Sequence, residues 1–118
     1  MFMAMKNSDP VLLRTCFTDS AIFQTVARDK SGSTVVRREN VAEFITMIST
    51  MPRGLADERI TYDVLRVDGP LAMVWTPYKF YLEGKFSHCG VNSFQLVRLA
   101  EGWRIQYLID TRRKQPCE

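Results

Sequence analysis

Three runs rich in Val, Ile, Phe, Tyr and Trp constrain the fold most, and together they span Leu71 to Arg112. Short polar breaks at Glu83-Gly84 and Glu101-Gly102 separate the runs, which is the pattern of a three-stranded antiparallel meander. Each run has about ten residues or more, whereas five or six residues are usual for a strand. Because long strands twist, a small domain must curl them around a core or a cavity.

The two breaks also predict the register, if each is a two-residue hairpin loop. Leu82 then pairs with Lys85, and alternation assigns every side chain to one of two faces. The predicted inner face carries Leu71, Met73, Trp75, His88, Asn92, Phe94, Leu96, Trp103, Ile105, Tyr107, Ile109 and Thr111. The predicted outer face carries Val74, Thr76, Tyr78, Cys89, Val91, Ser93, Gln95, Gln106, Leu108 and Asp110. Pro77 lacks a ladder donor and predicts a bulge or an edge position, and a bulge would move Tyr78 and Phe80 inward.

The preceding residues predict helices and shorter strands. A helix is expected over Val41 to Met51, because apolar residues recur there at helical spacing after the capping residue Asn40. A short helix is expected after Asp9-Pro10, and strands are expected over 21–27, 35–36 and 58–67. The order indicates one α+β domain, 1–118, with helices on one side of a sheet. Residues 1–6 are typical of the end of a longer helix, so the natural chain is expected to begin earlier or to have been cut.

Composition argues against several classes of function. The net charge of +3 comes from scattered basic residues, and only Arg112-Arg113-Lys114 forms a run, so no nucleic-acid surface is predicted. No apolar run approaches the roughly 20 residues of a membrane span. Three cysteines without a CxxC pair predict free thiols in a reducing compartment, and hence a cytoplasmic protein. No metal cluster or phosphate-binding glycine loop is visible, so no metal or cofactor is predicted.

The order of elements, the residues Phe17-Thr18-Asp19-Ser20-Ala21 and the hairpin Gly102-Trp103-Arg104-Ile105 resemble the nuclear transport factor 2-like superfamily. The resemblance is closest to its polyketide-cyclase-like and putative lumazine-binding branches of small bacterial proteins. It implies a cone, in which a strongly bent sheet wraps helices and leaves a pocket at its open end. The superfamily includes isomerases, dehydratases, epoxide hydrolases and cyclases, and also non-catalytic binding and dimerisation domains, so the fold does not settle the function.

Two residues are candidates for catalysis. His88, the sole histidine, titrates near neutral pH and is the natural acid or base, although a hydrogen-bonded or solvated histidine at the rim is an alternative. Asp110 would complete a histidine–carboxylate pair. The predicted register places Asp110 on the outer face, where it would pair with Arg112 or a partner subunit, and only a bulge in the last strands would bring it inward.

Aromatic and neutral polar residues suggest a ligand pocket, which is typically apolar with a few polar groups that orient the ligand. The candidate ligand-binding residues are Trp75, Tyr78, Asn92, Phe94, Tyr107 and Thr111. The sequence thus leaves two hypotheses open. One is a small-molecule pocket protein for a hydrophobic or aromatic ligand, acting as an isomerase, dehydratase or cyclase. The other is a non-catalytic ligand-binding or dimerisation domain.

The outer face is expected to form a homodimer. It combines small and β-branched residues with few charges, including Ala72, Val74, Val91 and Leu108. Soluble monomers rarely expose such a patch, whereas packed sheets bury one.

Overall fold

A computed structural model describes residues 5, 7–114 and 117. Within them lie two helices, α2 (Pro10–Thr15) and α3 (Val41–Ser49), and one seven-stranded sheet. The strands are β1 (Phe17–Arg28), β2 (Thr34–Glu39), β3 (Ala56–Ile60), β4 (Val64–Asp68), β5 (Leu71–Leu82), β6 (Lys85–Leu99) and β7 (Gly102–Thr111). The predicted strand over 58–67 is therefore two strands, and the expected first helix lies on residues that are mostly outside the described ones.

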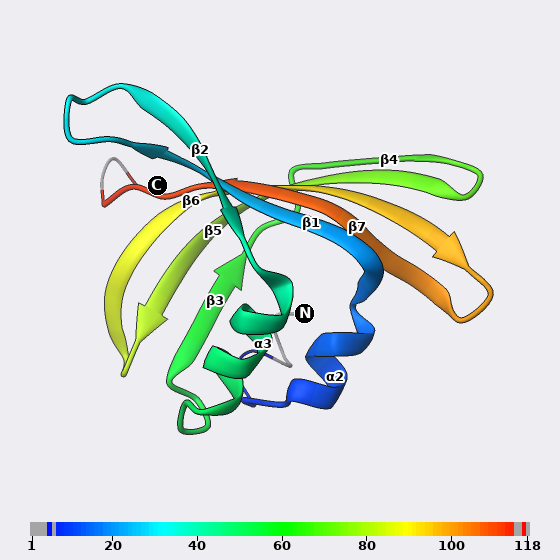
Figure 1. The fold of residues 1–118 in the computed structure, drawn as a ribbon, viewed down its shortest axis with the longest axis horizontal. Coiled ribbons are helices and arrows are strands. Elements are labelled where there is room, and N and C mark those ends of the chain that lie inside the picture. The colour runs from blue at the N-terminus through cyan, green and yellow to red at the C-terminus, as the bar shows by residue number, and fades with distance from the viewer. Residues whose placement is uncertain (1–4, 6, 115–116, 118) are drawn as a thin grey trace.

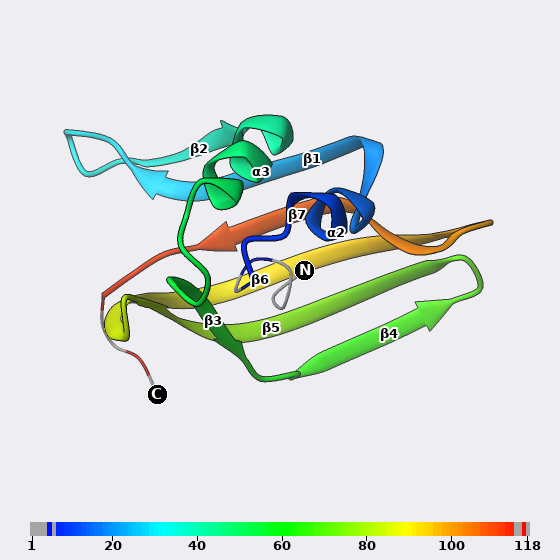
Figure 2. The same ribbon diagram turned by 90° about the horizontal axis from the view of Figure 1, so that it is seen from below.

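The sheet is mixed and strongly bent. Its order is β2-β1-β7-β6-β5-β3, and β4 pairs with the first half of β5 while β3 pairs with the second half. Strands β1 and β7 run parallel, and all other neighbours are antiparallel. Both helices lie on the concave side of the sheet (Figures 1 and 2). The predicted α+β cone, a bent sheet wrapped around helices, is confirmed.

Local sequence signals determine where the helices begin. The Asp9 carboxylate accepts a hydrogen bond from Leu12 N at 3.0 Å, and Pro10 follows in the first helical position. The Asn40 side chain accepts a hydrogen bond from Glu43 N at 2.9 Å. Helix α3 then turns Ile45 and Ile48 into the core. Both predicted helix starts are confirmed.

The β5–β6 hairpin has the predicted register only next to its turn. Leu82 does pair with Lys85, but Tyr81 pairs with Phe86 while Phe80 pairs with His88. Ser87 is therefore an extra residue in β6, and this bulge shifts every later pair by one position. No bulge forms at Pro77, which pairs with Val91.

The β6–β7 hairpin differs from the prediction in its turn and also contains a bulge. Leu99 pairs with Gly102, so the turn residues are Ala100 and Glu101. Farther along, Leu96 pairs with Ile105 but Gln95 pairs with Tyr107, which leaves Gln106 as an extra residue in β7. A bulge changes which face the following side chains occupy.

These shifts invert the predicted faces of β5 up to Phe80 and of the part of β7 that follows Gln106, whereas β6 keeps its predicted face and Ile105 lies in the core as predicted. Asn92 and Phe94 face the helices as predicted. Val74, Thr76, Leu108 and Asp110 join them there, although they were predicted to face outward. Trp75, Met73, Tyr107 and Ile109 lie on the convex face instead of the concave one. Buried side chains form an apolar row across the concave face, where Val74, Phe94, Leu108 and Phe23 are successive neighbours on four strands.

Candidate functional site

A row of buried polar side chains crosses the concave face beside this apolar row. Thr76 pairs with Asn92, Asn92 with Asp110, and Asp110 with Thr25, across strands β5, β6, β7 and β1. Their exposed fractions lie between 1% and 6%. Residues that are directly opposite share a face of the sheet, so these four form one continuous polar strip inside the cone.

Several atoms of this polar row lack hydrogen-bond partners. Among the described residues, no hydrogen bond within 3.5 Å reaches the hydroxyl oxygens of Thr25 and Thr76 or Oδ1 of Asp110, although the Thr25 hydroxyl interacts with the Asp110 carboxylate and lowers its pKa. A buried polar group without a partner costs roughly 1–3 kcal/mol. Folded proteins tolerate few such groups, and each one tends to mark a functional role, an ordered water or a bound ligand. The polar row is therefore the natural place to look for function.

Glu58 extends the polar row from the side of β3. Strand β3 brings Glu58 opposite Phe80, and its Oε2 accepts a hydrogen bond from Asn92 Nδ2 at 2.9 Å. Burial raises the pKa of Glu58 to about 7, an effect that the hydrogen bond from Asn92 opposes and the negative charge of Asp110 adds to. A carboxyl group with this pKa can both accept and release a proton near neutral pH.

Asp110 is the second carboxyl group of the site. Its Oδ2 accepts a hydrogen bond from Arg112 Nε at 3.4 Å, and Arg112 Nη2 lies 3.8 Å from Oε1 of Glu39. Burial raises the pKa of Asp110, and the positive charge of Arg112 opposes that rise. Arg112 is the partner that the sequence suggested for Asp110 on the outer face. The two residues do form a pair, but Asp110 lies on the concave face.

His88 lines the same cavity as the two carboxyl groups. Its ring stacks on Phe80 with centroids 5.0 Å apart and meets Tyr78 edge-on at 5.7 Å. Burial lowers the pKa of His88, and the positive charges of Arg112 and Lys114 lower it further. The imidazole is therefore neutral at pH 7, with Nδ1 lying 3.1 Å from the Ser87 hydroxyl.

A cavity of about 310 Å³ connects these groups. Its polar wall is formed by Glu39, Glu58, His88, Asn92, Asp110 and Arg112. Its apolar wall comes from the sheet and from α3, and includes Phe23, Phe44, Met47, Ile48, Met51, Phe80, Leu82 and Leu108. Mostly apolar walls with a few convergent polar groups are typical of a site for a small organic molecule.

The other residues predicted to bind a ligand lie elsewhere. Phe94 is buried in the core, and Tyr78 is buried with its hydroxyl donating to the backbone oxygen of Thr111 at 2.7 Å. The Thr111 side chain accepts a hydrogen bond from Val91 N at 3.1 Å. Trp75 lies on the convex face.

Tyr107 also lies on the convex face, where its hydroxyl donates to Gln24 Oε1 at 2.6 Å. Of the eight predicted site residues, His88, Asn92 and Asp110 line the cavity. The structure therefore brings together the two predicted catalytic candidates and one of the six predicted ligand-binding residues.

The sequence interpretation missed Glu58, Thr25 and Thr76. A signal for Glu58 was present, because it alternates with Ala56 and Ile60 and so shares their face of β3. A carboxylate in phase with apolar residues indicates a buried acid. Thr76 was assigned to the wrong face by the unrecognised bulge, and Thr25 resembles any other strand threonine.

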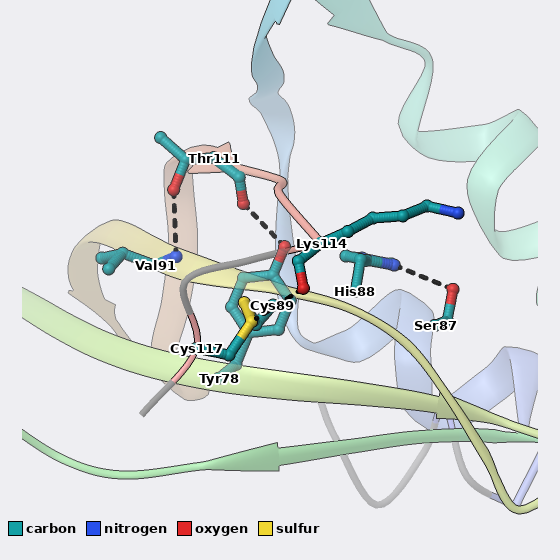
Figure 3. Close-up of a disulfide and its surroundings, with 8 residues drawn as sticks. All are labelled: Tyr78, Ser87, His88, Cys89, Val91, Thr111, Lys114 and Cys117. Carbon is teal, nitrogen blue, oxygen red and sulfur yellow. Dashed lines mark hydrogen bonds between the residues drawn. A yellow bond between two sulfur atoms is a disulfide. The ribbon is translucent and has the colours of Figure 1, made fainter.

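The chain's last described residues fold back beside the site (Figure 3). Arg113 and Cys89 exchange two backbone hydrogen bonds of 2.7 and 2.8 Å, and Cys89 forms a disulfide with Cys117. The prediction of free thiols is therefore wrong for this pair, while Cys16 is free. A Cβ at Gly90 would collide with the carbonyl oxygen of Thr111, so only glycine allows this close approach.

Two negative findings apply to the described part of the chain. It contains no group of three or more His, Cys, Asp or Glu side chains placed to hold a metal ion. Neither of its helices is long and apolar enough to cross a membrane.

Comparison with known proteins gives a fold but no close relative. No protein-family model and no curated protein sequence matches the chain. Among solved structures, a nuclear transport factor 2-like protein of unknown function from Shewanella baltica is similar, with a TM-score of 0.69 and 12% identity over 97% of this chain and 86% of that one. A domain of unknown function with a cystatin-like fold from Nostoc punctiforme has a TM-score of 0.70 and 21% identity over 98% and 72% of the two chains.

A third similar structure is a nuclear transport factor 2-like protein with a cystatin-like fold from Novosphingobium aromaticivorans. Its TM-score is 0.66, and it is 14% identical over 96% of this chain and 75% of that one. Identities this low establish the fold alone. With its bent mixed sheet, concave-side helices and interior cavity, the chain has the same cystatin-like cone fold as these nuclear transport factor 2-like proteins.

Proposed function

We propose that this protein binds a hydrophobic or aromatic small molecule in the cavity and transfers a proton to or from it, as an isomerase, dehydratase or cyclase does. The observation that supports this proposal is the placement of Glu58, with its pKa of about 7, in a largely apolar cavity that Asp110 also lines. A general base works best when its pKa lies near the working pH.

Each polar group of the cavity has a role in this proposal. Glu58 is the base, and Asn92, which donates to Glu58 Oε2, holds the carboxylate in place. Asp110 and His88 are the candidates for returning the proton or for stabilising charge that develops on the ligand. Arg112, bonded to Asp110, offsets the negative charge of the two carboxyl groups. The apolar wall contributed by α3 excludes water, which strengthens these interactions.

A proton-exchange experiment tests this function. A hydrophobic ketone such as 2-tetralone is incubated with the protein in D2O, and deuterium uptake next to the carbonyl is followed by mass spectrometry. We expect wild-type protein to accelerate the exchange, with a rate that rises with pH around 7 as Glu58 ionises. Glu58→Gln keeps the size of the side chain but removes the base, so it should reduce the acceleration by about 100-fold.

The matched control is Glu101→Gln, which makes the same chemical change at an exposed turn and should leave the exchange rate unaltered. Binding of the ketone, measured separately by calorimetry, should survive in Glu58→Gln. If the wild-type protein binds the ketone but does not accelerate exchange, the catalytic role is wrong and the non-catalytic alternative remains. Mass spectrometry of small molecules that co-purify with the protein would then identify what the cavity holds.

We further propose that the protein is a homodimer that pairs through the convex face of the sheet. The residues that support this proposal differ from those expected, because Ala72, Val74 and Leu108 are buried in the concave side. Met73 and Trp75 take their place and are 39% and 40% exposed. Large exposed apolar groups on a sheet face suit packing against a second sheet.

A further inference from the structure

A second hollow adjoins the cavity at the ends of β1, β2 and β7. It has a volume of about 560 Å³ and shares two wall residues, Glu39 and Arg112, with the cavity. Its charged wall consists of four arginines and one glutamate: Arg28, Arg37, Arg112, Arg113 and Glu39. The formal net charge of the whole chain is +3, so much of its excess positive charge gathers here.

The polar row of the cavity leads into this arginine-lined hollow. Thr25 ends the row on β1, lines the hollow, and is 5% exposed. Arg37 on β2 pairs directly with Thr25, so both side chains lie on the concave face. The Thr25 hydroxyl interacts with Asp110 and lowers the pKa of that carboxyl group, so the Arg37 guanidinium is the donor that this pair of residues offers to an incoming oxygen group.

Among the described residues, Arg37 makes one weak contact at the hollow, and Arg112, whose Nε bonds to Asp110 at 3.4 Å, makes a weak contact there through its Nη2. Arg112 reaches Glu39 at 3.8 Å, and both side chains are more than 40% exposed. Exposed pairs of this length contribute little to stability. Arg37 makes one long bond of 3.5 Å to the backbone oxygen of Arg28. An anion that replaced Glu39 as the partner of Arg112 would therefore displace only a weak contact.

We propose that the arginine-lined hollow binds an anionic oxygen group, a carboxylate or a phosphate, carried by the ligand whose apolar body occupies the cavity. This inference rests on the cavity being a ligand site, and it narrows the ligand to an amphipathic anion. Guanidinium groups recognise carboxylates and phosphates through paired N–H donors. Arg37 and Arg112 supply these donors. Arg112 lines both the hollow and the cavity, so one ligand can place its anionic group in the hollow and its apolar body in the cavity.

Calorimetry with matched probes tests the proposal. The probes are 2-naphthoate, its neutral analogue 2-naphthamide, and 2-naphthyl phosphate, which share one aromatic body. We expect the two anions to bind wild-type protein more tightly than the amide. Their affinities should fall as salt is raised, because ions screen charges. The tighter of the two anions identifies whether the group is a carboxylate or a phosphate.

Two substitutions separate the hollow from the rest of the surface. Arg37→Gln should weaken binding of the preferred anion by about tenfold, as expected for the loss of one charged hydrogen bond, and leave the amide unaffected. Arg38→Gln is the matched control, because Arg38 pairs with Gln24 and faces the convex side.

The outcomes distinguish failure of this inference from failure of the proposed function. If acid and amide bind equally well, or if Arg37→Gln behaves like Arg38→Gln, the hollow is not an anion site, although the cavity still binds aromatic bodies. If none of the three probes binds, the cavity is not a ligand site and both proposals fall.

Discussion

At the scale of single residues, Glu58 should make stability depend on pH. Burial raises its pKa from 4.5 to about 7, so between these values the folded protein keeps a proton that the unfolded chain releases. The contribution of Glu58 to the free energy of unfolding is therefore most favourable below pH 4.5. It falls by up to about 3 kcal/mol as the pH rises through 7. Glu58→Gln removes this loss, so the variant should become more stable relative to wild type as the pH rises.

Urea unfolding at pH 5, 6, 7 and 8 measures this effect. We expect the difference in unfolding free energy between Glu58→Gln and wild type to grow across the series. Glu101→Gln, at an exposed turn, should show a constant difference. A difference for Glu58→Gln that did not change with pH would mean that water reaches the carboxylate and that its pKa is ordinary.

At the scale of elements, the Cys89–Cys117 disulfide should stabilise the end of the chain against β6. The two cysteines are 28 positions apart, and closing a loop of this size raises the free energy of the unfolded chain by about 3.5 kcal/mol. Cys117→Ser should therefore lower the unfolding free energy by about that amount. Reductant should lower it similarly in wild type but have no effect on Cys117→Ser. Cys16→Ser, at the free cysteine, should keep the full response to reductant, and a wild-type protein insensitive to reductant would contradict the bond.

At the scale of the whole molecule, we expect the convex face to set the oligomeric state. Met73→Lys places a charge among its exposed apolar groups, and two-fold symmetry would repeat that charge across the interface. We expect light scattering to show a dimer for wild type and a monomer for Met73→Lys. Val11→Lys is the control, because Val11 is 75% exposed on α2, on the other side of the sheet, and should leave the dimer intact. A monomeric wild type at micromolar concentration would refute the assembly.

The sequence determined the class of fold and the beginnings of its helices, because those depend on local chemistry. Asn40 and Asp9 cap their helices through bonds to residues three positions ahead. The long apolar runs and the loop at Glu83-Gly84 specify a curled meander, since strand length and turn type are local properties. His88, Asn92 and Asp110 could be singled out because charged and amide groups are uncommon among so many apolar neighbours.

Tertiary structure alone decided which of these residues meet. Two bulges, at Ser87 and Gln106, turn Asp110 inward and Trp75 outward, and no local signal in the sequence marks them. A bulge forms where packing of both faces requires it, so its position depends on contacts between strands that are distant in sequence. The same is true of Glu58, which meets Asn92 across a separation of 34 residues. The polar row, the cavity and the arginine-lined hollow exist because the bent sheet brings distant strands into register.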